Sequence, residues 1–251
     1  MPVELPVFLL LLLVAGVAGF VDAVAGGGGL IQLPPLLALL GPAAAPGINK
    51  ASNFFGTCAA LTRYARHGSV RWTLLAVAGP LAFAGSLAGT LGYLEVVKRA
   101  APVIRPVFAV CFLALAAHQA WRVLRGAPEP TAPRPWPRVG LVFVGLIGLY
   151  DGFVGPGTGM FLFWAFTTWF ALPALEATGT TKAVNAITNF GSLTAFVSSG
   201  SILWRLALPM AAVNLAGGWL GARTAIRRGV RFIRLVTAIV CAGASIYLLL
   251  T

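Results

Sequence analysis

Charged residues are so widely spaced in this chain that long apolar stretches separate them. Lys, Arg, Asp and Glu make up 10% of the 251 residues, against about 25% in an ordinary globular domain. A helix that crosses a membrane needs about 20 apolar residues, and irregular backbone cannot face lipid. The sequence therefore predicts an all-α polytopic membrane protein. Its nearly uncharged segments are residues 5–21, 23–49, 51–62, 72–94, 106–121, 139–150, 152–175, 183–204, 206–222 and 235–251.

One short segment differs in composition from everything around it. Residues 126–137 contain five prolines, and closely spaced prolines favour an extended, solvated backbone. We interpret this segment as a linker. It divides the chain into an N-terminal transmembrane repeat, residues 1–125, and a C-terminal transmembrane repeat, residues 138–251.

The two halves carry an internal duplication. Residues 49–72 align without gaps on residues 181–204 and share eight identities in 24 positions. The identical pairs are Lys50/Lys182, Ala51/Ala183, Asn53/Asn185, Leu61/Leu193, Thr62/Thr194, Gly68/Gly200, Ser69/Ser201 and Trp72/Trp204. Further upstream, the segment that ends at Asp22 falls on the one that ends at Asp151, and a glycine-rich run follows each. About five hydrophobic segments per half, an odd number, predict two inverted repeats.

The arginines favour this inverted arrangement. With five crossings in each half, residues 63–71, 122–138 and 223–234 lie on one side of the membrane and hold 12 arginines. Basic loops face the cytoplasm, so we expect a cytoplasmic linker and both termini outside the plasma (inner) membrane. Four crossings per half would instead give parallel repeats without a clear charge bias. Because these loops explain the net charge of +12, no nucleic-acid partner is expected.

Each glycine-rich run precedes a short apolar stretch, residues 30–40 or 160–172. Both stretches are short for a full crossing and are predicted to be half-helices or re-entrant elements. A helix N-terminus offers free N–H groups and a positive dipole end to an anion, and glycine allows close approach of the backbone. Close helix packing without a ligand is the alternative. The candidate anion-binding glycines are Gly26, Gly27, Gly28, Gly29, Gly155, Gly157 and Gly159.

Asp22 and Asp151 are carboxylates inside apolar segments and occupy equivalent positions in the repeats. An intramembrane carboxylate usually faces a cavity or pairs with a cation. It is therefore a candidate for proton coupling. The alternative is a structural role, as a cap on the glycine-rich turn or as the partner of a lysine.

Lys50 and Lys182 are candidates for direct contact with an oxyanion. Amide residues lie beside each lysine: Asn49 and Asn53 beside Lys50, and Asn185 and Asn189 after Lys182. Asn53 and Asn185 follow the lysines by one helical turn, so these amide and ammonium groups would share a face. Alternatively, each lysine extends to the membrane interface.

Other kinds of site find little support. His67 and His118 have no second metal ligand nearby in the sequence, so no metal is expected. The glycine-rich runs lack the Lys-Ser/Thr ending of a nucleotide loop, and we expect no cofactor. An enzyme acting on a lipid phosphate would need an acid–base set that the apolar segments lack. Gln32 and Asn214 are weaker polar candidates.

Four strings carry a resemblance to a known family: GFVDAVAGGGGLIQLPPLLALLG, NKASNFFGT, YDGFVGPGTGMF and TTKAVNAITNFGSL. With them the chain resembles the sulfite exporter TauE/SafE family, and within it the YfcA-like group of membrane transporters. The resemblance implies a multi-pass plasma-membrane transporter of sulfur-containing anions such as sulfite and organosulfonates, and it covers nearly the whole chain.

These observations predict a secondary transporter, by resemblance an exporter, that moves a small anion by alternating access between two repeats. It is not expected to be an enzyme. A passive anion channel on the same architecture is the alternative. The expected partners are the small anion and membrane lipids. The sequence is compatible with a homo-oligomer as well as a monomer, because small-residue pairs such as Gly85 and Gly89 can pack helices within one chain or between two.

Overall fold

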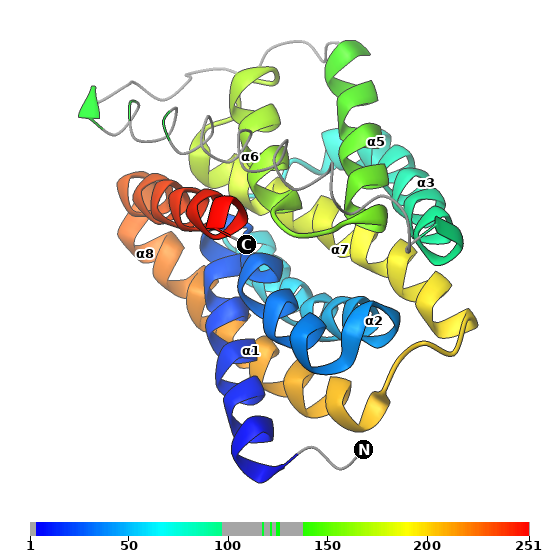
Figure 1. Ribbon diagram of the computed structural model, residues 1–251. Coiled ribbons are helices and arrows are strands. Elements are labelled where there is room, and N and C mark those ends of the chain that lie inside the picture. The colour runs from blue at the N-terminus through cyan, green and yellow to red at the C-terminus, as the bar shows by residue number, and fades with distance from the viewer. Residues whose placement is uncertain (1–3, 97–116, 118–120, 122–123, 126–137, 251) are drawn as a thin grey trace.

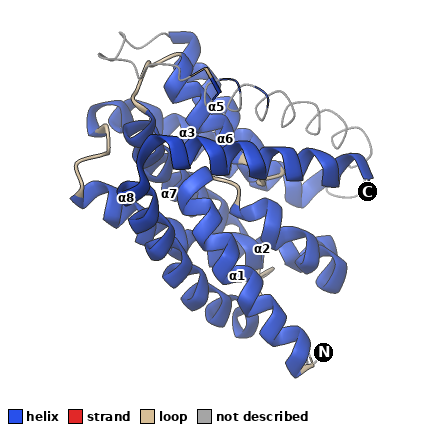
Figure 2. Cartoon of the chain, turned by 90° about the vertical axis from the view of Figure 1, so that its left-hand side faces the viewer, coloured by secondary structure: helices blue, strands red, loops and turns tan. Residues whose placement is uncertain are grey.

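The computed structural model describes residues 4–96, 117, 121, 124–125 and 138–250. The predicted linker and most of the predicted segment at 106–121 lie outside this part of the chain. Within it all regular structure is helical (Figure 1, Figure 2), which confirms the all-α prediction for these residues. The helices are α1 (Leu5–Ala25), α2 (Gly28–Arg66), α3 (Trp72–Val96), α5 (Arg138–Phe153), α6 (Thr158–Thr168), α7 (Ala174–Ser198) and α8 (Trp204–Leu250).

Two long helices are each interrupted at a glycine. The backbone leaves helical geometry at Gly41 in α2 (φ 69°, ψ 179°) and at Gly229 in α8 (φ 72°, ψ −164°). Positive φ costs glycine little because it has no Cβ. The part of α2 before Gly41 is therefore a short helix of its own. α6 is also short, with 11 residues, and at 1.5 Å per residue it reaches only about 16 Å.

The helix boundaries differ from those that the charges suggested. The apolar segments 23–49 and 51–62 meet at Lys50, yet α2 continues through this residue. α7 likewise continues through Lys182, and Asp151 lies within α5 rather than at its end. A charge ends an apolar segment in the sequence, but it does not end the helix when the fold supplies a partner for it.

Each half uses the same order of elements. The alignment of the repeats places α1 on α5, the part of α2 before Gly41 on α6, and the part after it on α7. It also places α3 on the part of α8 before Gly229. The counterpart of the remaining part of α8 falls almost entirely outside the described residues.

Close contacts between backbones hold the two halves together. α1 packs along α8, and α3 packs along α5 (Figure 1), so each contact joins an N-terminal helix to a C-terminal one. A Cβ at Gly85 would lie 2.3 Å from the carbonyl oxygen of Gly145, and one at Gly217 would lie 2.1 Å from that of Gly16. Without a side chain at these positions the helices approach closely, as small residues allow in membranes.

The outer surface and the interior show the reverse of a water-soluble distribution. Large apolar side chains are exposed on α1 and α5, for example Leu5 at 68%, Leu13 at 64% and Val139 at 71%, whereas lysine, aspartate and asparagine side chains are buried. Among the described residues, α1, α2 and α3 are long and apolar enough to cross a membrane. Lipid would cover this apolar surface, and the polar groups lie inside the bundle.

We expect Gly85→Leu to lower the thermal unfolding midpoint of the purified protein, because its side chain would separate α3 from α5. Overpacking of this kind costs about 1–3 kcal/mol. Gly243→Leu is the matched control, since a Cβ at Gly243 meets none of the described residues within 4 Å. Thermal melting in detergent, followed by tryptophan fluorescence, measures both. Equal melting of the two variants would contradict the role given to this contact.

Candidate functional site

The polar interior is built on α2 and α7, which pack against each other in the middle of the bundle (Figure 1). α2 carries Lys50 and Asn53, and α7 carries their repeat equivalents Lys182 and Asn185. All four side chains are buried. The positions that the duplication marks in the sequence therefore come together at the contact between the halves.

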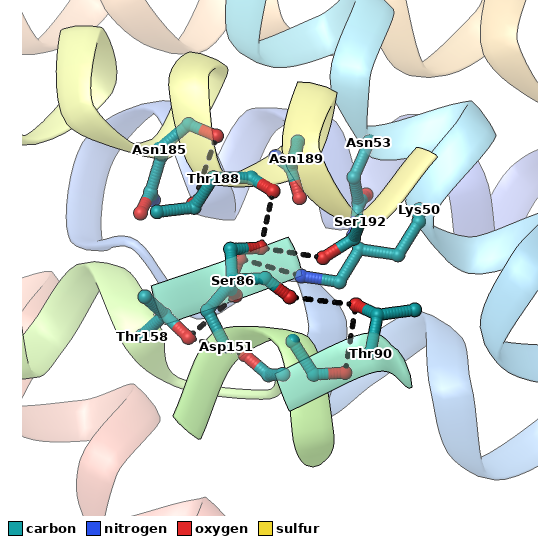
Figure 3. Close-up of polar contacts among 12 residues, drawn as sticks. Lys50, Asn53, Ser86, Thr90, Asp151, Thr158, Asn185, Thr188, Asn189 and Ser192 are labelled. Carbon is teal, nitrogen blue, oxygen red and sulfur yellow. Dashed lines mark hydrogen bonds and ion pairs between the residues drawn. The ribbon is translucent and has the colours of Figure 1, made fainter. Parts of the chain in front are cut away.

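Two ion pairs connect the halves, and they are reciprocal. Lys50 Nζ lies 2.6 Å from Asp151 Oδ2, and Lys182 Nζ lies 2.9 Å from Asp22 Oδ2. Each lysine thus pairs with the aspartate of the other repeat, and Figure 3 shows the first pair. The side chains of Lys182 and Asp22 are 0% and 13% exposed. Both ammonium groups face carboxylates inside the bundle rather than the membrane surface.

Each aspartate also binds the start of the short helix in its own half. Asp22 Oδ1 accepts a hydrogen bond of 3.4 Å from the N–H of Gly28, the first residue of α2. Asp151 Oδ1 accepts one of 2.7 Å from the hydroxyl of Thr158, the first residue of α6 (Figure 3). The aspartates therefore make both contacts of the structural alternative, a helix-start hydrogen bond and a lysine ion pair, and they also border a cavity.

The two glycine-rich runs touch each other. A Cβ on Gly26 would lie 2.5 Å from Cα of Gly159, and one on Gly29 would lie 3.3 Å from Cα of Pro156. Gly26, Gly155 and Gly157 have φ between 81° and 90°, which residues with a Cβ rarely adopt. Any side chain at the Gly26–Gly159 contact would separate the turn between α1 and α2 from the first turn of α6.

A small cavity lies between the glycine-rich runs and the lysine-bearing helices. Its volume of about 20 Å³ is roughly what one water molecule needs. The lining residues are Asp22, Gly26, Gly29, Asn49, Lys50, Asn53, Asp151, Gly155, Gly157, Thr158, Gly159, Asn185 and Asn189. Three candidates from the sequence do not line it. Gly27 faces Met160 and Val240, Gly28 faces Ala18 and Asp22 of α1, and Lys182 contacts the Asp22 carboxylate.

Thr158 is the lining residue that the sequence analysis missed. Its hydroxyl donates to Asp151 and also lies 2.7 Å from the carbonyl oxygen of Gly155. The available signal was a hydroxyl residue at the start of a helix after a glycine-rich turn, where such residues satisfy free backbone and side-chain groups.

A cluster of amides from α2 and α8 extends the cavity wall. The Asn214 amide donates to Gln32 Oε1 and to Asn53 Oδ1, both at 3.0 Å. Asn53 in turn donates to Asn49 Oδ1 at 3.2 Å. The repeat equivalent of Asn214 is Ala82, so the N-terminal half lacks this amide. Of the two weaker candidates, Asn214 contacts the lining residue Asn53 directly, and Gln32 is linked to Asn53 through Asn214.

A cluster of hydroxyl groups supports the opposite wall (Figure 3). Ser86 of α3 donates 2.6 Å to the carbonyl oxygen of Thr188 and shares a 2.7 Å hydrogen bond with Ser192. Thr90 donates to the carbonyl oxygen of Gly152, next to Asp151. These bonds hold α3 against α5 and α7, and so they fix the helix that presents the Asp151 carboxylate.

Comparison with known proteins now identifies the family. The model of the sulfite exporter TauE/SafE family matches residues 11–248. The chain belongs to this family. It is 34% identical over 241 residues to the probable membrane transporter protein ORF9 of Sinorhizobium sp, an alignment that covers 95% of this chain and 91% of the relative. No solved structure matches it.

Other TauE/SafE-like relatives carry the same kind of name. The probable membrane transporter protein YfcA of Escherichia coli is 32% identical over 247 residues, covering 95% of this chain and 88% of the relative. A probable membrane transporter protein of Haemophilus influenzae is 30% identical over 239 residues, covering 93% and 91%. The chain is therefore a membrane transporter of this family rather than an enzyme, as the sequence predicted.

We expect Lys182→Met to destabilise the protein strongly, because it leaves the Asp22 carboxylate buried without its cation. Removing one member of a buried pair costs about 3–5 kcal/mol, whereas replacing both members is often neutral. The double variant Lys182→Met/Asp22→Asn should therefore recover most of the lost thermal stability, measured in detergent. If the double variant melts as low as the single one, the ion pair is not what stabilises this contact.

Proposed function

We propose that the protein is a secondary transporter of small sulfur-containing anions, of the size of sulfite or a short organosulfonate, that works by alternating access between two inverted repeats. The observation that carries the proposal is the pair of reciprocal lysine–aspartate contacts around the cavity. In these contacts the cationic donors lie at the contact between the two halves of the chain. Transporters built from repeats bind their substrates at the interface between the repeats.

The groups around the cavity suit an oxyanion. An ammonium group has three N–H donors, and one side of the Lys50 ammonium group faces Asp151. The other N–H donors can face a ligand. The amides of Asn53, Asn185 and Asn189 border the same space. The cavity also lies beside the first turns of α2 and α6, where unpaired N–H groups and the helix dipole favour negative charge. Several donors converging from different sides match a ligand with several acceptor oxygens.

The size of the cavity supports a conformational cycle. About 20 Å³ has room for one water, whereas sulfite has four heavy atoms. An anion can bind only if the walls separate. Because the walls belong to different halves of the chain, motion of one half against the other would open the space. A channel, by contrast, requires a continuous pore, and this arrangement favours the transporter.

The remaining parts of the proposal concern placement in the cell. We propose the plasma (inner) membrane, with the basic segments, including the linker at 126–137, on the cytoplasmic side and both termini outside. The arginines of residues 63–71 and 223–234 support this orientation through the positive-inside rule. Export is the direction that the family name suggests for this chain.

Purified protein in proteoliposomes tests the proposal directly. We expect saturable flux of at least one of sulfite, thiosulfate, sulfate and sulfoacetate, and none of acetate as the carboxylate control. The double variant Lys50→Met/Asp151→Asn, which keeps the site electrically neutral, should fold and lose at least about 90% of the flux, because it removes the ion pair that lines the cavity.

Arg205→Ala is the matched control for this double variant, since Arg205 is an exposed cation at the start of α8 and should leave flux unchanged. Absence of flux for every anion, from folded wild-type protein, would refute the proposed function. Unitary currents would identify a channel instead. Full flux in the double variant would show that Lys50 does not bind the anion and that its role is structural.

A further inference from the structure

The charges at the site add up to zero. Lys50 and Lys182 contribute two positive charges, and Asp22 and Asp151 contribute two negative ones. Among the described residues that line the cavity, the charged ones are Asp22, Lys50 and Asp151, and Lys182 pairs with the first of them. The site is therefore neutral before any substrate arrives.

A neutral buried site cannot accept an anion without further compensation. Each negative charge on the substrate would leave one excess negative charge in surroundings that screen it poorly, and burying an unpaired charge is strongly unfavourable. A proton that binds one of the two aspartates removes this excess. The same proton also weakens the aspartate's attraction for its lysine, whose ammonium group then becomes available to the anion.

We propose that the protein carries its anion together with one proton for each negative charge, so that the transport cycle is electroneutral. This inference rests on the proposed function and adds to it the coupling ion and the stoichiometry. The two aspartates set the upper limit at two protons, enough for a dianion.

Lys50 and Asp151 form the pair at which the exchange takes place in this conformation. Both line the cavity, whereas the Lys182 side chain is fully buried and contacts Asp22. A proton from solution binds an oxygen of Asp151, the ion pair separates, and Lys50 keeps its own proton and binds the anion. After the anion leaves on the other side, Asp151 releases its proton there and the ion pair forms again.

The groups that face the two carboxylates are consistent with this assignment. Around Asp151 they are Lys50 of α2, Thr158 of α6 and, through the neighbouring carbonyl of Gly152, Thr90 of α3. Around Asp22 they are Lys182 of α7, the Thr57 hydroxyl of α2 and the N–H of Gly28, and Tyr64 of α2 donates to the neighbouring carbonyl of Ala23. The hydroxyl and amide groups stay neutral near pH 7, so the lysines supply the balancing charge.

Flux in proteoliposomes under an imposed pH gradient and an imposed potassium diffusion potential tests the inference. The probe is whichever of sulfite and methanesulfonate the wild-type protein transports, and protein-free vesicles subtract the leak. We expect methanesulfonate, which stays monoanionic, to accumulate about tenfold per pH unit on the alkaline side. A potential of either sign should leave the initial rate of either probe unchanged.

Two carboxylate-to-amide variants sharpen the test. Asp151→Asn leaves the site with one excess positive charge, so a monoanion can bind without a proton. Its transport should lose the dependence on the pH gradient and become sensitive to membrane potential. Glu176→Gln is the matched control, because Glu176 pairs with Arg71 at 3.3 Å and does not line the cavity. Transport by Glu176→Gln should remain electroneutral and dependent on the pH gradient.

The outcomes separate this inference from the function on which it rests. Flux that responds to the potential and ignores the pH gradient in the wild type would overturn electroneutral proton coupling and leave the anion transporter in place. Flux that needs a sodium gradient would do the same. No flux of these probes or of thiosulfate, sulfate and sulfoacetate, from folded protein, would overturn the proposed function and this inference with it. If Asp151→Asn fails to fold, the wild-type flux under the two gradients still tests electroneutral proton coupling.

Discussion

The two buried ion pairs are the constraint on which the rest of the architecture depends. Lysine and aspartate inside a membrane bundle are tolerable only when each finds a partner. In this chain the partner always comes from the other half, at 2.6 Å and 2.9 Å. Neither half can bury its own charges alone, so the halves must associate, and any motion between them changes these contacts.

The glycines make this association possible at short range. Gly26 and Gly159 bring the turn between α1 and α2 into contact with the first turn of α6, while Gly85 and Gly217 let outer helices of one half lie on those of the other. Lipid supplies no hydrophobic force between helices, so close packing and polar contacts must hold them. The same glycines leave a cavity of only about 20 Å³ beside the ion pairs, so tight packing keeps the site small.

Much of the fold and of the candidate site could be predicted from the sequence. Apolar stretches predicted a helical membrane protein, and the duplication marked Lys50, Asp151 and their equivalents before any coordinates. The helix boundaries were predicted less well, because an unpaired lysine looks like the end of an apolar segment while a paired one sits inside a helix. The role of Thr158 and the contact of Gln32 with Asn214 were not predicted from the sequence for a related reason. Their roles depend on neighbours far away in the chain.

What the sequence determined by itself is local and periodic: apolar length, the positions of glycine and proline, the repeated motifs and the charge count. These follow from the solvent that each segment must face and from the conformations that each residue can adopt. Only the tertiary structure decided which charges meet. Each of the two lysines had two candidate aspartates, and the reciprocal choice, Lys50 with Asp151 and Lys182 with Asp22, follows from how the helices of the two halves pack.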